Sequence, residues 1–146
     1  MDFKNAKELL ELSQNEKLTI SEVMRQRELS ETESSPEELY TKMERVLEIM
    51  KDSASTPIQK PVTSMGGLIG GEAKRLSLHE ASGTRLCGEV LHKGITKAMA
   101  VLETNASMGL IVAAPTAGSA GIVPGFLLAL QEVYECPDDT MIQVLY

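Results

Sequence analysis

The chain has 146 residues, 42% of them hydrophobic, which suits one soluble domain with an apolar core. Its formal net charge of −7 disfavours nucleic acid and an anionic membrane surface as partners. Two cysteines are too few for a disulfide scaffold, and the charged N-terminus lacks the apolar region of a signal peptide. We therefore expect a cytoplasmic protein.

Three helices are predicted in the charge-rich residues 1–53. Each begins with a side chain that can cap a helix and has a glutamate three residues later, which is capping-box spacing. The pairs are Asn5 with Glu8, Thr19 with Glu22, and Ser35 with Glu38. The third helix carries an apolar stripe at helical spacing, formed by Leu39, Met43, Val46, Leu47 and Met50. The stripe is typical of core packing, with a partner-binding surface as the alternative.

A Ser- and Pro-rich stretch, SASTPIQKP at residues 53–61, is predicted to be a connector. The composition changes there, because the net charge is −5 over residues 1–53 and −2 over the remainder. We therefore divide the chain into a helical lead (1–53), a connector with a glycine loop (54–71) and a helical domain (72–146).

The glycine loop contains four glycines within residues 66–71. Such a run predicts a strained backbone or a close approach to another group. It lacks the GxxxxGK[ST] spacing of a phosphate loop. Either it is a flexible loop, or Ser64, Gly66 and Gly67 offer a hydroxyl and backbone N–H groups to a small anion.

Two further helices are predicted, at residues 72–80 and from Thr84 to about residue 103, with a break at residues 82–84. One face of the longer helix carries Cys87, Leu91, Ile95, Ala98 and Leu102. Cys87 is interpreted as a small core residue rather than a ligand. His79 and His92 have no metal-ligand spacing around them and are expected at the surface or in the core.

Residues 104–131 contain no charged side chain, which first suggests a membrane helix. Prolines, glycines and polar residues interrupt the run, and their backbone groups would lack partners in lipid. We predict instead a buried helix or strand over residues 107–114, a turn at 116–121 and a helix over 124–134. The start of that last helix is either an anion site or a close helix–helix contact through small residues. Another helix, with acids in its first turn, is predicted after Pro137.

These segments resemble a known family. The sequences NASMG at residues 105–109 and IVAAPTAGSAGIVP at 111–124 closely resemble the alpha chain of bacterial iron–sulfur-dependent L-serine dehydratase. SMGG at 64–67, LCG at 86–88 and ISEVM at 20–24 are also similar to that family. The resemblance extends over essentially the whole chain.

The resemblance implies a mainly α, helical catalytic domain that converts L-serine to pyruvate and ammonia. Family members use a [4Fe–4S] cluster rather than pyridoxal phosphate, and one iron assists the departure of the serine hydroxyl as a Lewis acid. A base removes the Cα proton, and the aminoacrylate product tautomerises and hydrolyses. A beta subunit and an oligomeric enzyme are also implied.

The resemblance places the cluster ligands elsewhere. Family alpha chains carry them in a Gly-Gly-Cys motif and a later Cys-Asp-Pro…Cys segment, neither of which occurs here. Cys87 and Cys136 do not match these motifs, so no metal ligand is expected in this chain. We expect the chain to be the N-terminal part of such a subunit, inactive alone.

The resemblance also suggests substrate-binding residues, and no catalytic base is assigned. The predicted wall that recognises serine contains Ser64, Gly66, Gly67, Thr116 and Gly118, whose hydroxyls and N–H groups suit a carboxylate. Asn105 is predicted to bind substrate or to fix the adjoining turn. Two other functions stay open: a helical interaction subunit without chemistry, and an anion- or nucleotide-binding module on the glycine loop.

Overall fold

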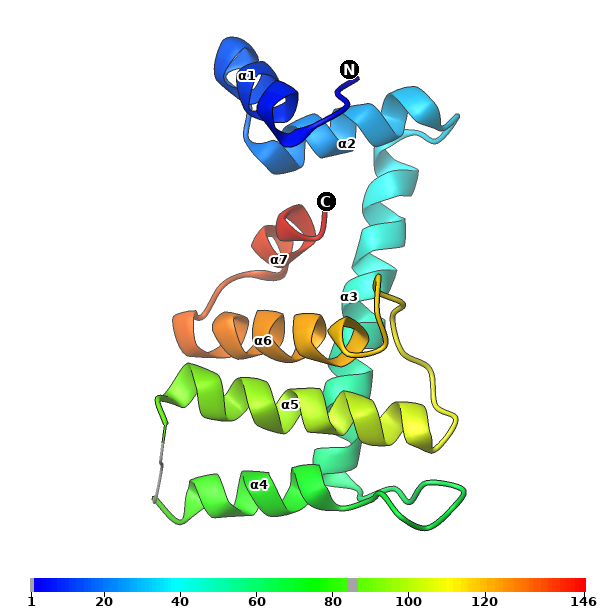
Figure 1. Ribbon diagram of the computed structural model, residues 1–146, viewed down its shortest axis with the longest axis vertical. Helices are drawn as coiled ribbons and strands as arrows, with labels where there is room; N and C mark the ends of the chain where they lie inside the picture. The colour runs from blue at the N-terminus through cyan, green and yellow to red at the C-terminus, as the bar shows by residue number, and fades with distance from the viewer. Residues whose placement is uncertain (1, 84–86) are drawn as a thin grey trace. The chain divides into compact units, whose positions relative to one another are not determined.

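The computed structural model describes residues 2–83 and 87–146, and these contain only helices as regular elements (Figure 1). The helices are α1 (Ala6–Glu16), α2 (Ile20–Glu31), α3 (Pro36–Gln59), α4 (Glu72–Ala81), α5 (Glu89–Ala106), α6 (Ser119–Tyr134) and α7 (Asp138–Val144). The mainly α prediction is therefore confirmed. Within these residues, no helix combines the length and the apolar character needed to cross a bilayer.

The chain forms two compact units. Unit 1 contains the residues up to 45 together with 138–146, and unit 2 contains residues 46–137. Helix α3 contributes residues to both units. The division at residues 53 and 71 that the composition suggests stays a prediction.

In unit 1 the predicted caps are confirmed. Asn5 accepts the backbone N–H of Glu8 at 3.0 Å at the start of α1. At the starts of α2 and α3 the cap bonds are reciprocal, between Thr19 and Glu22 and between Ser35 and Glu38. The backbone N–H of Thr19 also lowers the pKa of Glu22. Local sequence signals therefore define where these helices begin.

Unit 1 is closed by contacts of α2 with α1 and α7. Val23 of α2 is completely buried. Tyr40 donates a hydrogen bond to Asp139 at 2.5 Å, which joins α3 to the first turn of α7 and raises the pKa of Tyr40 to about 12. The Arg27 guanidinium lies 4.6 Å from the centre of the Phe3 ring.

Helix α3 is longer than expected. It continues through Gln59, so the connector predicted from residue 53 is wrong for residues 53–59, although Pro57 lies inside the helix. The apolar stripe is core, as expected, because Leu39, Leu47 and Met50 are buried.

In unit 2, α5 packs against both α4 and α6 (Figure 1). The prediction of α4 is confirmed. Helix α5 begins at Glu89, so Cys87 precedes it, and Thr84, its expected cap, lies outside the described residues.

The buried face of α5 is more polar than its sequence suggests. Its buried residues include His92, Thr96 and Glu103. Leu91, Ile95 and Leu102, on the apolar face that the sequence predicts, are all more than 40% exposed. His92 lies in the core, where its Nε2 is 3.3 Å from the carbonyl oxygen of Leu76.

The uncharged run also differs from expectation. Residues 107–114 are neither helix nor strand. Helix α6 begins at Ser119, so Pro124 lies inside the helix rather than at its start. The helix ends at Tyr134, as predicted, with Glu135 in a left-handed conformation.

Candidate functional site

Two irregular segments of unit 2 lie at the same end of its helices. Residues 60–71 lead into α4, and residues 107–118 connect α5 to α6. Because α4, α5 and α6 run in alternating directions, the starts of α4 and α6 and the end of α5 gather on one side of unit 2, called the loop end below (Figure 1). All six predicted substrate-binding residues lie in these segments or in the last turn of α5.

The glycine loop, residues 64–71, is folded back on itself. The Ser64 N–H donates to the carbonyl of Ile69 at 2.8 Å, and the Ile69 N–H donates to the Ser64 hydroxyl at 3.1 Å. The Gly67 N–H donates to the Ser64 carbonyl at 2.9 Å. The Ser64 hydroxyl is therefore already an acceptor inside the loop. The loop N–H groups that have no partner among the described residues are those of Met65, Gly66 and Leu68.

Gly70 has a conformation that other residues rarely adopt. Its φ is +154°, and a Cβ atom there would overlap the carbonyl oxygen of Val62 and lie 2.9 Å from the Cα of Thr63. The backbone on the two sides of the loop therefore meets at Gly70, and only glycine leaves room for that approach.

A buried carboxylate holds the end of the glycine loop. Glu103 of α5 is 1% exposed. Its carboxylate accepts the backbone N–H of Ala73 at 2.7 Å and that of Gly71 at 3.2 Å. These are N–H groups at the start of α4, which have no partner within that helix. A negative charge is also favourable there, because the helix dipole is positive at its N-terminus.

A second carboxylate lies beside the first. Glu72 accepts the backbone N–H of Gly70 at 2.7 Å, and this bond, together with the N–H of Glu72 itself and the nearby Arg75 charge, lowers the pKa of Glu72. Arg75 pairs with the other oxygen of Glu72 at 2.8 Å. Two glutamates, one from α4 and one from α5, therefore fix the backbone of residues 70–73.

The last turn of α5 is itself tied to α3. Pro57 has no N–H, so the carbonyl of Ser53, four residues earlier, has no partner within α3. The Thr104 hydroxyl donates to that carbonyl at 2.8 Å. This side chain therefore replaces the helical bond that proline removes, and it fixes the turn of α5 that carries Glu103.

The start of α6 is held by a local cap. The Ser119 N–H donates to the Thr116 hydroxyl at 3.1 Å, and the Thr116 N–H donates to the Ser119 hydroxyl at 2.9 Å. The two hydroxyls are also 3.0 Å apart. The Thr116 hydroxyl that we assigned to substrate therefore caps α6 in this structure. This cap explains why the helix begins before Pro124.

Small residues bring α5 and α6 close together. A Cβ atom on Gly125 would lie 2.7 Å from the backbone nitrogen of Ala98, and one on Gly94 would lie 2.7 Å from the Phe126 ring. The small-residue pattern thus serves close helix packing, one of the two interpretations that the sequence left open.

An apolar groove of about 380 Å³ lies between α5, α6 and residues 107–118. Exposed side chains of Ile95, Leu102 and Ile122 contribute to its walls. Two of the predicted site residues, Asn105 and Gly118, line it as well. The structure therefore brings Asn105 of α5 and Gly118 of the second segment to one groove.

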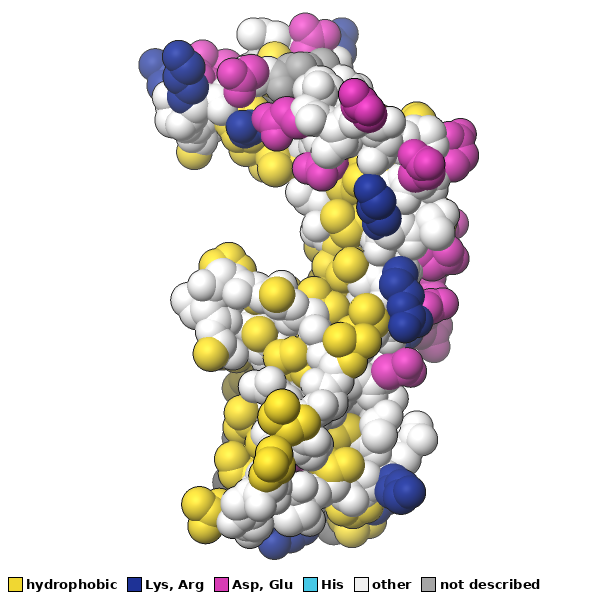
Figure 2. Space-filling view, turned by 90° about the vertical axis from the view of Figure 1, so that its right-hand side faces the viewer, with side chains coloured by type: hydrophobic (Ala, Val, Ile, Leu, Met, Phe, Trp, Pro, Cys, Tyr) yellow, Lys and Arg dark blue, Asp and Glu magenta, His cyan; other side chains and the backbone are white. Residues whose placement is uncertain are grey.

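The loop end exposes further apolar side chains. Those of Met65 and Leu68 in the glycine loop are 84% and 90% exposed, and Met108 and Leu110 of the second segment are also exposed. Figure 2 faces this end of unit 2, in its lower part, where yellow apolar side chains gather. This surface can bury apolar groups as well as bind polar ones.

The six predicted residues thus fall into two groups. Ser64, Gly66 and Gly67 belong to the glycine loop, whereas the other three lie at the groove or the adjoining cap. Their assignment to substrate stays a prediction. Sequence reasoning missed Glu103, whose role depends on a partner segment 30 residues away. The available signal was its position as the last charged residue before the uncharged run.

The opposite end of unit 2 is charged. Glu132 of α6 pairs with Lys93 and, at 3.0 Å, with Lys97 of α5. Burial raises the pKa of Glu132, but hydrogen bonds from the two lysines outweigh burial and lower it. The hydrogen bond to Glu132 raises the pKa of Lys93. These groups satisfy one another as an ion-pair cluster.

The thiols also lie away from the loop end. Cys87 precedes α5 and Cys136 follows α6, at the helix ends opposite the two loop segments (Figure 1). In residues 2–83 and 87–146 no three His, Cys, Asp or Glu side chains are grouped as a metal site would require. The described residues therefore do not fit an iron–sulfur cluster, which needs several cysteine thiolates.

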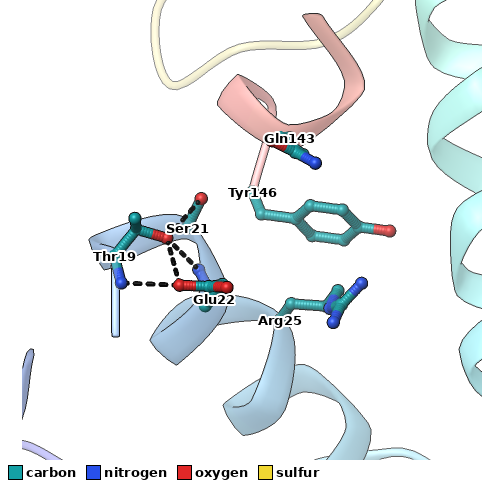
Figure 3. Close-up of a pocket in the computed structure, with 6 residues that line it drawn as sticks. All are labelled: Thr19, Ser21, Glu22, Arg25, Gln143 and Tyr146. Atoms are coloured by element: carbon teal, nitrogen blue, oxygen red, sulfur yellow. Dashed lines mark hydrogen bonds between the residues drawn. The ribbon is translucent and has the colours of Figure 1, made fainter. Parts of the chain in front are cut away.

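Unit 1 contains a small pocket of about 130 Å³ beside α2 (Figure 3). Thr19 and Glu22, which line it, bond to each other as the cap of α2. Arg25 and Tyr146 form another part of the wall. None of the six predicted site residues lies in this pocket.

Comparison with known proteins gives one family. Residues 15–146 match the family described as "Serine dehydratase alpha chain". A probable L-serine dehydratase alpha chain of Bacillus subtilis is 39% identical over 144 residues, 99% of this chain and 48% of that protein. The L-serine dehydratase alpha chain of Peptoniphilus asaccharolyticus is 35% identical over 138 residues, 94% of this chain and 47% of that protein.

A more distant match is L-serine dehydratase of Helicobacter pylori, 34% identical over 133 residues, which is 87% of this chain and 28% of that protein. The chain therefore spans about half the length of the two alpha chains named above, and less of this relative. No solved structure matches the chain.

Proposed function

The chain belongs to the serine dehydratase alpha chain family, and from this premise we propose that it is part of an enzyme that converts L-serine to pyruvate and ammonia. The observation that carries the proposal is the family match over residues 15–146, together with alpha-chain relatives at 35% and 39% identity. Because the chain spans about half of those relatives, we assign the activity to a longer protein.

We propose that the loop end of unit 2 contributes to the serine site. The two segments that carry most of the family-like sequences both lie there, and in the glycine loop three N–H groups have no partner among the described residues. Backbone N–H groups suit the carboxylate of an amino acid. Gly66 and Gly67 would keep side chains away from that carboxylate, and Asn105 would bind substrate from the groove.

Under this proposal the Thr116 hydroxyl has two roles. It would bind substrate, and it already caps α6. In the complete enzyme we expect Thr116→Val to raise the half-saturating serine concentration about tenfold, equivalent to one lost hydrogen bond. Steady-state pyruvate formation measures this. Thr116→Ser keeps the hydroxyl and is the matched control, and unchanged kinetics in the valine variant would remove Thr116 from the site.

The iron–sulfur cluster implied by the resemblance has no ligand set among the described residues. We therefore assign the cluster to residues outside this chain and derive no catalytic step through it. The proposed role of this chain is to bind and orient serine and to maintain the conformation of the loop end.

The apolar groove favours a second function, which is that of an interaction subunit. Exposed apolar side chains around a groove of about 380 Å³ are typical of a surface that another polypeptide covers. A beta subunit or the remaining half of a longer alpha chain would fit. This function does not require chemistry in the present chain.

The test is anaerobic reconstitution with iron and sulfide, followed by a pyruvate assay on L-serine. It compares this chain with a version extended to the length of its relatives, each with a partner subunit. We expect cluster absorbance and pyruvate only in the extended version. Activity in the short chain would contradict the assignment of the cluster ligands to residues outside this chain. No activity in either version would favour the interaction subunit.

A further inference from the structure

We propose that Glu103 is a positioning residue for substrate binding, because its buried carboxylate fixes the glycine loop. The inference rests on the proposed function, since it gives the glycine loop to serine. Glu103 itself would not touch the substrate. It would act through the backbone of residues 70–73.

Burial of the Glu103 carboxylate has an energetic cost. Glu103 is 1% exposed, and a buried carboxylate is unfavourable unless hydrogen bonds satisfy it. The donors found are the backbone N–H groups of Gly71 and Ala73, at 3.2 and 2.7 Å. Both belong to the junction of the glycine loop and α4. The most deeply buried acid of unit 2 is thus committed to holding this junction.

The turn of α5 that carries Glu103 is itself held in place. Thr104, the next residue, donates to the Ser53 carbonyl of α3 at 2.8 Å. The turn of α5 that carries Glu103 is therefore fixed from a third helix. A carboxylate on a fixed turn can hold a loop in one place, whereas a carboxylate on a frayed helix end could not.

Fixing the end of the glycine loop also restricts the backbone of its other residues. Gly70, directly before the bonded junction, approaches Val62 so closely that no Cβ atom fits. The Ser64–Ile69 bonds then close the rest of the loop. The N–H groups of Met65, Gly66 and Leu68 are left without partners among the described residues, and their direction follows from the anchored end. Asn105 follows Glu103 by two positions. The last turn of α5 therefore both holds the glycine loop and carries Asn105, the substrate-binding residue predicted at the groove.

The first experiment measures amide hydrogen exchange in this chain. Glu103→Gln keeps the side-chain length and one acceptor oxygen but presents an NH₂ group to a backbone donor. We expect exchange in residues 64–73 to accelerate about tenfold, as for the loss of one hydrogen bond, with the rest of unit 2 unchanged. Glu89→Gln, at the other end of α5, is the matched control and should leave loop exchange unchanged. Unchanged exchange in Glu103→Gln would overturn the inference.

The second experiment measures kinetics in the full-length alpha chain with its partner subunit. We expect Glu103→Gln to raise the KM for L-serine about tenfold while kcat changes less than about threefold, because the loop serves binding. If Glu103→Gln fails to fold, Glu103→Asp keeps the charge, shortens the reach and gives the same readouts.

The outcomes separate the inference from the proposed function. If the wild-type enzyme is active and loop exchange rises while KM does not change, the role of Glu103 in substrate binding is wrong and the proposed function stands. If the wild-type enzyme forms no pyruvate, the proposed function fails, and with it the link to serine. The exchange experiment then decides alone whether Glu103 anchors the loop.

Discussion

The two ends of unit 2 are held by different kinds of polar interaction. At the loop end, carboxylate and hydroxyl groups of α5 bond to backbone atoms of other segments, as Glu103 does to Ala73 and Thr104 to Ser53. At the opposite end, where His92 also contacts the backbone carbonyl of Leu76, Glu132 pairs with the side chains of Lys93 and Lys97. Side chains that bond to backbone atoms of another segment fix the course of the chain, whereas ion pairs between the tips of flexible side chains leave it more adjustable. At the loop end, bonds of this kind hold the irregular backbone of residues 70–73 in one course, which a binding site there would require.

The change expected to disturb the loop end most is Gly70→Ala. The new Cβ atom would overlap the Val62 carbonyl, and the φ of +154° is strained for alanine. We expect a loss of about 3 kcal/mol in the free energy of unfolding, measured by urea titration with circular dichroism. Gly66→Ala, where nothing lies within 4 Å of the new atom, is the control. Equal stability of the two variants would show that the loop rearranges freely.

A smaller loss is expected where α5 and α6 cross. Gly125→Ala places an atom 2.7 Å from the Ala98 backbone, which cannot move aside. Overpacking outweighs the gain in helix propensity, and we expect a loss of about 2 kcal/mol. Gly94→Ala meets the Phe126 ring instead, which can rotate, so its loss should be below about 1 kcal/mol. Thermal unfolding of both variants tests this order, which a larger loss in the Gly94 variant would reverse.

Removing the Thr104 hydroxyl tests the tie to α3. Thr104→Val keeps the shape but leaves the Ser53 carbonyl without its partner, and we expect a loss of about 1.5 kcal/mol. The exposed Thr41 gives a control, Thr41→Val, expected to stay within about 0.5 kcal/mol of wild type. If the two variants have the same midpoint of urea unfolding, α3 does not need the Thr104 bond to replace the helical hydrogen bond that Pro57 cannot donate.

The smallest effect is expected at the charged end, from Glu132→Gln. The Glu132 side chain is 47% exposed, so we expect a loss below about 1 kcal/mol at pH 7. The folded pKa is lowered from 4.5, so this contribution is present above pH 4.5 and is lost as the pH falls through the folded value. The difference from wild type should also shrink in about 1 M salt. A difference that persists at pH 3 and in high salt would contradict the ion-pair explanation.

Sequence reasoning succeeded where the determining groups are neighbours in the chain. The caps at Asn5, Thr19 and Ser35 each depend on a residue three positions later, and all three form. The stop of α6 before Pro137 is local in the same way. A pattern of adjacent residues contains all the information that such an element needs.

Prediction from the sequence failed where contact with a distant segment determines the local structure. The Ser- and Pro-rich stretch at residues 53–59 is helical although it contains Pro57, and Thr104, about fifty positions later, bonds to the carbonyl that the proline leaves free. The apolar face of α5 is partly exposed, because that face lines the groove with α6. In the candidate site, Glu103 could not be found from spacing, since nothing near it in sequence indicates which N–H groups it accepts.

The long-range anchoring of the glycine loop has a consequence for biosynthesis. Gly71 precedes Glu103 by 32 residues, so the loop is synthesised before the residue that holds it. At about 5–20 residues per second, this interval lasts roughly 2–6 s on the ribosome. During that time α4 can form, but its first N–H groups and the loop beside it have no fixed partner. The rate of translation between these two codons therefore determines how long the nascent loop lacks the carboxylate that fixes its conformation.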